Sequence, residues 1–344
     1  MTRKLLAGGL TLTLLPLTAC ARQQKMYTAT WFDIFDTVTT VQGYAVSKQE
    51  WNEQADALHT DLLRLHEQLD IYNAYDGLTN LYTVNRCAAD APVQVEPELF
   101  DFLQWACKDV YTATNGAVNP AAGAVLRLWH DARESDSPAP PTQTAIDEAL
   151  QHCDADKLLL DAENHTVYFA DAAMQLDVGA VAKGYAAVQA GQKAAQCGIE
   201  HALLNVGGNV YIIGDKPDGS AWRVGVENPW GDSPQYLQTV ELHKGDSLIV
   251  SGDYQRYFTY NGVRYAHLID LTTGWPATYY SSTAVYTHPD TGWGDAWSTA
   301  LFCLPTEQSE ALAESHADTM GALWMHADGT LRQSSGWTGK NAIE

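Results

Sequence analysis

The order of strand and helix patterns along this 344-residue chain constrains its fold more than any other sequence feature. Residues 31–46 are rich in β-branched and aromatic side chains, which predicts a strand. Between residues 48 and 70 an apolar residue recurs every three or four positions, which predicts a helix with one buried face. Because strands and helices alternate irregularly, the sequence predicts an α+β fold with mixed or antiparallel sheets and flanking helices. The other predicted elements are a helix at 98–112, a loop at 135–141, a hairpin at 156–176, a helix that ends near 197, a strand from 201 that Gly207 and Gly208 interrupt, a hairpin at 257–267 and a short helix at 295–304.

The N-terminus has the pattern of a targeting segment. Two early cations precede an apolar run at residues 5–17, which is shorter than the about 20 residues that a transmembrane helix needs. The following LTAC (17–20) is similar to the bacterial lipobox, in which the cysteine becomes the lipidated first residue of the mature chain. A secretory signal with an incidental Cys20 is the alternative. We expect an extracytoplasmic protein, anchored through Cys20 to the inner or the outer membrane of a bacterium, with a signal peptide at 1–19, a lipid-anchored tether at 20–30 and one domain at 31–344.

Acidic residues outnumber basic ones by 42 to 20, which gives a formal net charge of −22. A surface this negative disfavours nucleic acid and anionic membrane surfaces as partners. An anionic substrate would therefore need local positive charge, from a metal ion or from a few well-placed Lys and Arg side chains.

Five cysteines follow Cys20, and neither CxxC nor metal-ligand spacing relates them. Since five is an odd number, they cannot all form disulfides with one another. We expect most of them to be buried as small apolar side chains, and one bridge remains possible outside the cytoplasm. The five are Cys87, Cys107, Cys153, Cys197 and Cys303.

Residues 176–190, LDVGAVAKGYAAVQA, place two charges in an otherwise small and apolar segment. The apolar pattern predicts a buried strand that runs into a helix. A buried carboxylate or ammonium group is costly unless it is paired, hydrogen-bonded or bound to a ligand or metal ion. Asp177 and Lys183 therefore either stabilise the structure or mark a site.

Three further motifs carry side chains suited to chemistry, and each also has a purely structural explanation. The segment SGDYQR (251–256) suits phosphate or sugar contacts, or it is a surface turn. His267 and Asp270 could be a base and its orienting partner, or a structural pair. Asp295 and Thr299 are four residues apart on a predicted helix and share one face. They could be oxygen ligands of Mg²⁺, or a helix cap and a core threonine.

Taken together and in order, six segments resemble the FAD:protein FMN transferase family, also called ApbE. The resemblance covers nearly the whole mature chain, and six motifs in one order are far more specific than any single motif. The resemblance implies an ApbE-like single globular domain with an FAD cleft between its lobes. The segments are FDTVTT (35–40), LDVGAVAKGYA (176–186), NVGGNV (205–210), SGDYQRYF (251–258), HLIDLTTGWPA (267–277) and GDAWSTALF (294–302).

The resemblance also implies an activity. Members of the family take FAD and Mg²⁺, transfer FMN to a threonine or serine of a target protein through a phosphoester, and release AMP. They are extracytoplasmic and often lipoproteins, so we expect targets among the subunits of membrane redox complexes, with the acceptor pattern Asp-x-x-Thr/Ser-Gly-Ala-Thr/Ser. Some relatives mainly hydrolyse FAD to FMN and AMP, so an FAD diphosphatase is one alternative. A lipid-anchored flavin-binding protein without catalysis is another.

Carried over position by position, the resemblance implies roles for individual residues. Mg²⁺ would be held by the backbone carbonyl of Ala180 and the side chains of Asp295 and Thr299. His267, with Asp270 nearby, is our candidate for the base that takes the proton from the target hydroxyl. At positions 36–37, Asp-Thr replaces the family's commoner Gly-Thr pair. The residues expected to contact FAD are Phe35, Tyr72, Ala117, Val118, Asn119, Asp177, Lys183 and Ile269, with the Lys183 ammonium as a partner for phosphate.

Overall fold

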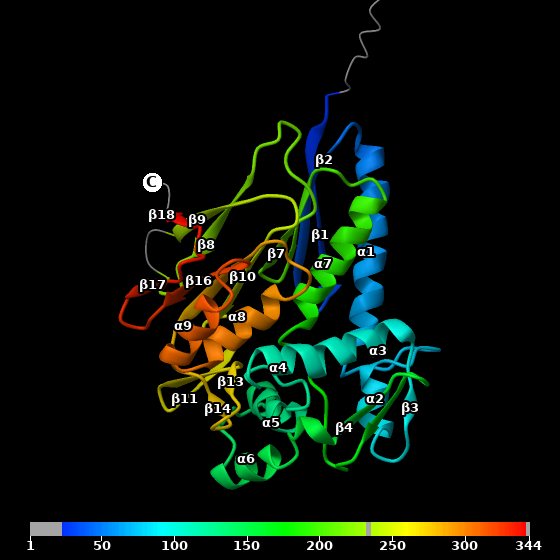
Figure 1. Ribbon diagram of the computed structural model, residues 1–344, viewed down its shortest axis with the longest axis vertical. Helices are drawn as coiled ribbons and strands as arrows, with labels where there is room; N and C mark the ends of the chain where they lie inside the picture. Colours follow the sequence, from blue (N-terminus) through cyan, green and yellow to red (C-terminus); the bar gives the residue numbers. More distant parts are fainter. Residues whose placement is uncertain (1–22, 232–234, 342–344) are drawn as a thin grey trace, which may run out of the picture.

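The computed structural model describes residues 23–231 and 235–341, and its centre is an eight-stranded sheet (Figure 1). Every neighbouring pair of strands in this sheet is antiparallel. This sheet and the helices beside it agree with the predicted α+β class. In spatial order the strands are β1 (Lys25–Ile34), β2 (Thr37–Ala45), β6 (Ala202–Val206), β7 (Asn209–Ile212), β10 (Ser247–Gly252), β15 (Ser282–Thr287), β16 (Met320–Met325) and β17 (Leu331–Gln333).

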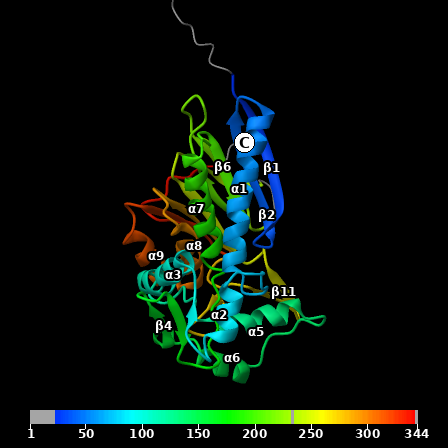
Figure 2. The same cartoon turned by 90° about the vertical axis from the view of Figure 1, so that its right-hand side faces the viewer.

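Helices cover one face of the main sheet, and a small sheet covers the other. On the first face, α1 (Lys48–Leu69) and α7 (Ala182–Gln196) lie side by side (Figures 1 and 2). Beside them α8 (Gly294–Cys303) packs on β10 and β15. On the other face lies a three-stranded sheet of β8 (Trp222–Glu227), β9 (Tyr236–Leu242) and β18 (Lys340–Asn341). Tyr211 packs with the helices whereas Val210 and Ile212 pack towards the small sheet, as the alternation of side chains along a strand requires.

The remaining elements surround the lower end of the main sheet in Figure 1. A hydrophobic core fills this region, and Phe100, Phe102 and Phe169 are among its fully buried side chains. The helices here are α2 (Leu81–Cys87), α3 (Pro97–Gln104), a π-helix (Trp105–Val110), α4 (Tyr111–Ala113), α5 (Gly123–Glu134), α6 (Gln143–Leu150) and a 3-10 turn (Ala155–Lys157), whereas α9 (Thr306–Glu314) packs beside α8 and against β16. The strands are β3 (Val93–Gln94), β4 (Leu158–Asp161), β5 (Thr166–Phe169), β11 (Tyr257–Tyr260), β12 (Val263–Ala266), β13 (Ile269–Asp270) and β14 (Trp275–Pro276).

Most of the predicted elements are confirmed, but three boundaries differ. The strand predicted at 31–46 is two strands, because the chain reverses at Phe35 and Asp36. Its first strand begins at Lys25, inside the segment expected to be a tether. The predicted helix at 98–112 contains the π-helical turn. The expected signal peptide and Cys20 lie outside the described residues.

Gly207 and Gly208 form the two-residue turn of the β6–β7 hairpin. Both have positive φ angles, +55° and +93°, which is the backbone that a tight hairpin turn requires. The interruption predicted in this strand is therefore a chain reversal.

The five described cysteines are all free, so the bridge that the sequence left possible is not formed. Cys107 and Cys303 are buried, as expected, and burial raises the pKa of both thiols. Cys87 and Cys197 are exposed, so the expectation that most are buried was wrong. Within residues 23–231 and 235–341, no helix combines the length and the apolar character that crossing a membrane requires.

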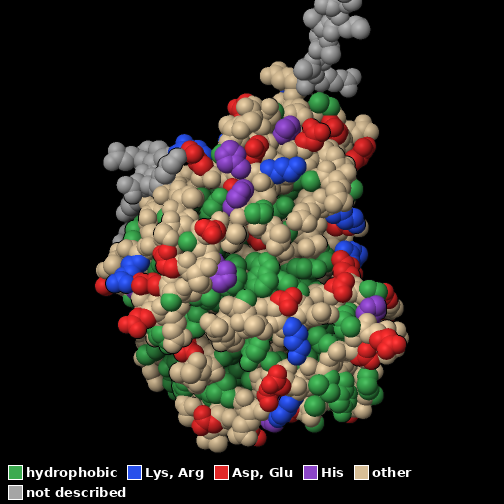
Figure 3. Space-filling view, in the orientation of Figure 1, with side chains coloured by type: hydrophobic (Ala, Val, Ile, Leu, Met, Phe, Trp, Pro, Cys, Tyr) green, Lys and Arg blue, Asp and Glu red, His purple; other side chains and the backbone are tan. Residues whose placement is uncertain are grey.

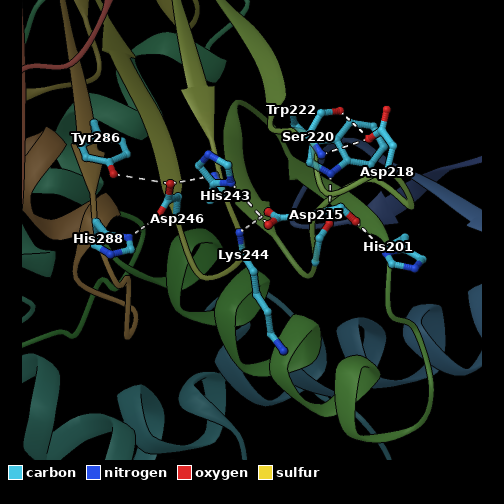
Figure 4. A network of polar contacts seen from close by, with 11 residues as sticks. His201, Asp215, Asp218, Ser220, Trp222, His243, Lys244, Asp246, Tyr286 and His288 are labelled. Atoms are coloured by element: carbon cyan, nitrogen blue, oxygen red, sulfur yellow. Dashed lines mark hydrogen bonds and ion pairs between the residues drawn. The ribbon is translucent and has the colours of Figure 1, made fainter.

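A network of polar side chains lies where β10 begins and β15 ends (Figure 4). The Asp246 carboxylate accepts the backbone N–H of His243 (2.7 Å), and its other oxygen contacts His288 Nδ1. The carbonyl of Gly245 then accepts the N–H of Asp290 (2.8 Å). Asp290 in turn accepts three backbone N–H groups at 292–294, where α8 begins. This network therefore fixes the start of α8.

Candidate active site

The segment at 176–181 connects three parts of the lower region. Leu176 donates its N–H to Asn85 Oδ1 (2.7 Å), and its carbonyl accepts a hydrogen bond from Asn85 Nδ2 (2.9 Å). The N–H of Asp177 donates to the carbonyl of Pro120 (2.8 Å). A side chain and a loop thus satisfy these backbone groups, so the predicted strand was wrong here, whereas the predicted helix, α7, is confirmed. The apolar pattern indicated burial, and burial does not require a sheet.

The three oxygen groups expected to bind Mg²⁺ lie close together. Thr299 Oγ1 is 3.5 Å from the carbonyl oxygen of Ala180. Asp295 lies one turn before Thr299 on α8, and its Oδ2 accepts the N–H of Gly184 (3.0 Å). Burial raises the pKa of Asp295, and the nearby Lys183 opposes this rise. A carbonyl, a hydroxyl and one carboxylate are the hard oxygen ligands that Mg²⁺ takes beside water and substrate phosphate.

The expected ligand set carries one negative charge, that of the Asp295 carboxylate. Across the residues that the structure describes, no three His, Cys, Asp or Glu side chains group as a metal site would require. One carboxylate leaves room for the ligands that a phosphate substrate would bring. The donors present therefore fit Mg²⁺ better than a metal that prefers nitrogen or sulfur ligands.

Gly184 allows α7 and α8 to approach each other at this point. A Cβ atom at Gly184 would lie 2.5 Å from the Cβ of Asp295, closer than carbon atoms pack. Only glycine therefore leaves room for Asp295 to reach the backbone of α7.

Asp177 and Lys183 both form hydrogen bonds with the backbone of Gly179. Lys183 Nζ donates to the carbonyl of Gly179 (3.1 Å), and Asp177 Oδ1 accepts the N–H of Gly179 (2.8 Å). Lys183 Nζ is also 3.8 Å from Asp295 Oδ2, which is its one ion pair in the described part of the chain. Burial raises the pKa of Asp177, and Lys183 is among the cations that oppose the rise. Lys183 is thus placed beside the proposed metal ligand and is not held in a pair with Asp177.

His267 is oriented by a backbone carbonyl. Both its N–H and its Nδ1 lie 3.1 Å from the carbonyl oxygen of Arg256. Since a carbonyl only accepts, Nδ1 carries the proton, which leaves Nε2 with a free lone pair. Burial lowers the pKa of His267 to about 3, and Lys183 and Arg256 contribute to the decrease. The imidazole is therefore neutral at pH 7 with a free lone pair on Nε2, and the negative charge of a bound phosphate would raise its pKa towards the range in which a base acts.

Asp270 does not orient His267, so the pairing expected from the sequence was wrong. Its Oδ1 accepts the N–H of Thr272 (2.8 Å), and its Oδ2 accepts the hydroxyl of Tyr279 (2.9 Å). Its backbone carbonyl accepts the N–H of Gly274 (2.8 Å). The chain bends at His267 between β12 and β13, and Thr272 and Tyr279 take the two carboxylate oxygens of Asp270. Asp270 therefore holds the turn that follows β13.

The turn between β1 and β2 has an unusual backbone. Phe35 and Asp36 both adopt positive φ angles, +50° and +49°, which non-glycine residues rarely do. The strain at Asp36 explains physically why glycine suits this position better. Arg256 Nη2 donates to the carbonyl of Asp36 (2.8 Å), and the ring of Phe35 packs edge-on against His66. Arg256 thus connects this turn to the carbonyl that orients His267.

The sequence did not predict that α5 borders the site. Arg127, His130 and Arg133 are spaced three apart, so they share one side of the helix. Tyr72 stacks on His130 with ring centroids 5.0 Å apart, and the Arg127 guanidinium lies 5.8 Å from the centre of its ring. Burial and the charge of Asp177 raise the pKa of Tyr72 to about 12, whereas Arg127 and Arg133 oppose this rise. Arg127 and Arg133 also pair with acidic side chains of the same helix, Asp131 (2.7 Å) and Glu134 (2.9 Å), so α5 places guanidinium groups near Tyr72 without a net excess of positive charge.

Several other residues expected to contact FAD are buried or form hydrogen bonds within the protein. Val118 is buried, and Asn119 Nδ2 donates to the carbonyl of Cys153 (2.8 Å). Ala117 and Asn119 precede Pro120, which contacts Asp177, so this loop borders the site. Ile269 is buried in an apolar cluster around Trp129. Their contacts with FAD stay predictions.

Charges are unevenly distributed over the surface. Figure 3 shows acidic side chains scattered over one face, and hydrophobic side chains gather near its middle, where α7 and α8 lie in Figure 1. Against the net charge of −22, the site gathers Lys183, Arg127, Arg133 and Arg256 within range of Tyr72, Asp177 and His267. Since Arg127 and Arg133 form close ion pairs with Asp131 and Glu134, Lys183 and Arg256 are the cations best placed to meet an anionic substrate.

Comparisons with known proteins bear on the family and the fold of the chain. A sequence model of the ApbE family matches residues 35–324. The FAD:protein FMN transferase of Treponema pallidum is 34% identical over 319 residues, which cover 88% of this chain and 85% of the relative. The enzyme of that name from Klebsiella pneumoniae is 29% identical over 257 residues, 75% of this chain and 78% of the relative. The crystal structure of the ApbE protein of Thermotoga maritima is similar with a TM-score of 0.81 and 27% identity, covering 90% of this chain and 97% of that one. The single ApbE-like α+β domain that the sequence implied is confirmed.

Proposed function

The chain belongs to the ApbE family, and we propose that it uses this site to transfer FMN from FAD to a hydroxyl group of a protein. The observation that carries the proposal is the convergence of Ala180, Asp295 and Thr299 beside the Lys183 ammonium. Such a site binds a pyrophosphate through oxygen-liganded metal and positive charge.

The reaction is an attack on phosphorus. The oxygen of the acceptor hydroxyl bonds to the phosphorus of the FMN half of FAD, and the bond from that phosphorus to the AMP oxygen breaks. The electron pair of the broken bond leaves with AMP, and the hydroxyl proton goes to His267 Nε2. The free lone pair on Nε2 suits this role, because the proton on Nδ1 is held by the Arg256 carbonyl.

Positioning and charge account for most of such a reaction. When bound at Ala180, Asp295 and Thr299, Mg²⁺ would neutralise charge on the phosphoryl oxygens. Lys183 supplies a second positive charge, 3.8 Å from Asp295, and its carbonyl contact with Gly179 fixes its direction.

We also propose that the protein is extracytoplasmic and lipid-anchored through Cys20, with subunits of membrane redox complexes as its targets. The support is the signal-like segment at 1–19 and its LTAC ending. Labelling of cells with a palmitate analogue tests the anchor: wild type should incorporate the label, and Cys20→Ala should not. Equal labelling of both would contradict it.

The activity is tested by incubating the protein with FAD, Mg²⁺ and a peptide that carries Asp-x-x-Thr-Gly-Ala-Thr. The proposal predicts a peptide whose mass has increased by covalent FMN, with release of AMP. A control peptide with the acceptor threonine replaced by valine should stay unmodified. Free FMN and AMP with unmodified peptide would indicate a diphosphatase, and unchanged FAD would indicate a binding protein; either result would overturn the proposal.

A further inference from the structure

The β11–β12 hairpin leads directly to the proposed base. Arg256 precedes β11 and His267 follows β12, and the N–H of His267 donates to the Arg256 carbonyl to close the hairpin at its root. In the described part of the chain, β11 and β12 pair only with each other. The hairpin extends beside α5 (Figure 2), with Asn261 and Gly262 at its tip.

Aromatic packing holds this hairpin in place. Phe258 and Tyr265 stack with ring centroids 5.2 Å apart, and the ring of Trp129 lies 5.9 Å from that of Tyr265. Trp129 Nε1 also donates to the carbonyl of Gly274 (2.7 Å). The hairpin is therefore braced against α5, and the side chains that it exposes have a fixed position.

Its exposed side chains differ in kind from the rest of the surface. Tyr257, Tyr260 and Val263 are 43%, 40% and 51% exposed, and they are three of the eleven large hydrophobic side chains that are exposed among the described residues. Residues 255–267 contain two arginines and no acidic residue, in a chain with 42 acidic residues. Arg264 lies over the ring of Tyr257, 4.7 Å from its centre, and its Nη1 donates to Asp253 Oδ1 (3.1 Å). Exposed tyrosine and arginine side chains of this kind carry much of the binding energy in protein interfaces.

We propose that the exposed part of the β11–β12 hairpin, formed by Tyr257, Tyr260, Val263 and Arg264, binds the protein that receives FMN. The inference rests on the proposed function, because that reaction brings a protein hydroxyl to His267 Nε2. β12 has four residues and spans about 13 Å, so the flanks of an acceptor segment reach the hairpin tip while its hydroxyl is at His267. The occupant is an extended segment with apolar and acidic side chains, since the hairpin offers aromatic surface and the Arg264 guanidinium, for which an acidic side chain of the segment would compete with Asp253.

The test separates acceptor binding from chemistry. The acceptor is a soluble carrier protein that displays an extended loop with the pattern Asp-x-x-Thr-Gly-Ala-Thr. In the double variant Tyr260→Ser/Val263→Ser, the KM for the carrier should rise at least about tenfold, while kcat and the Kd for FAD stay as in wild type. The matched control is Leu159→Ser/Leu331→Ser, which removes two exposed apolar side chains on β4 and β17 and should leave the KM unchanged.

A second variant tests the charge. Arg264→Gln should raise the KM for the carrier and make it less dependent on salt concentration. An unchanged KM in both hairpin variants would overturn the inference, as would equal losses in kcat and FAD affinity, which would assign the hairpin to the shape of the site. A dimer of wild type that the double variant abolishes would assign the surface to a second copy of the chain. If wild type itself forms no covalent FMN product, the proposed function fails, and this outcome is distinct from all the others.

Discussion

Replacing Gly184 by alanine tests whether the close approach of α7 and α8 builds the metal site. The added Cβ would lie 2.5 Å from the Cβ of Asp295, whereas carbon atoms pack at about 3.5–4.0 Å. The two groups must therefore separate by about 1 Å. This shift would lengthen the 3.0 Å hydrogen bond from Gly184 to Asp295 and move that carboxylate away from Ala180.

Two energies follow from this displacement. Overpacking costs about 1–3 kcal/mol of folding stability. The better helix propensity of alanine offsets about 1 kcal/mol of this cost. For activity, a misplacement of about 1 Å at a catalytic group can cost on the order of 100-fold. The variant should therefore lose up to about 2 kcal/mol of stability and lose activity more severely.

Gly191→Ala is the matched control, because it lies two turns further along α7. Its added Cβ would meet the ring of Tyr211 at 2.6 Å, so it overpacks the same helix against the sheet without touching Asp295. The assay measures urea unfolding and the Mg²⁺ concentration that gives half-maximal FMN transfer. Both variants should be destabilised, but only Gly184→Ala should need at least about ten times more Mg²⁺. An equal Mg²⁺ requirement in the two variants would refute the reasoning.

Three further predictions concern the base and its surroundings. Burial lowers the pKa of His267 from 6.5 to about 3, so between these pH values the unfolded chain binds a proton that the folded chain excludes. The free energy of unfolding of wild type should therefore fall as the pH falls from 6.5 towards 3, and urea titrations should find a smaller fall in His267→Gln; equal pH dependence would contradict the shift. Asp270→Asn should cost about 1–3 kcal/mol of stability, because the Tyr279 hydroxyl loses its acceptor, and should leave kcat nearly unchanged; a large loss in kcat would restore Asp270 as the partner of the base. Arg256→Ala keeps the backbone carbonyl that orients His267 but removes the contact with Asp36, so it should raise the KM for FAD more than it lowers kcat; the reverse would show that the guanidinium acts in the chemical step.

Periodicity predicted the elements whose burial is regular. The stripe that includes Trp51, Leu58 and Leu65 gave α1, because one face of that helix is fully buried. The Asn261-Gly262 pair gave the β11–β12 turn, since both residues take the positive φ that such a turn requires. The sequence did not predict the chain reversal at Phe35 and Asp36, because neither residue is a glycine.

The site was predicted less completely than the fold. The spacing of Asp295 and Thr299 placed them on one helix face, but only the resemblance related them to Ala180. The pairing of His267 with Asp270 failed because nearness in sequence does not tell where side chains point when the chain bends between them, as it does between β12 and β13. The apolar pattern around Asp177 indicated burial correctly, yet the groups that satisfy its backbone come from residues far away in the sequence.

The rate of FMN transfer as a function of Mg²⁺ concentration, in wild type and in Asp295→Asn, tests the central claim most directly. Transfer by wild type should stop in EDTA and return when Mg²⁺ is added. Asp295→Asn should still bind FAD but require at least about ten times more Mg²⁺, or transfer no FMN. Transfer that persists in EDTA, or an unchanged Mg²⁺ requirement in the variant, would contradict a metal site at Ala180, Asp295 and Thr299.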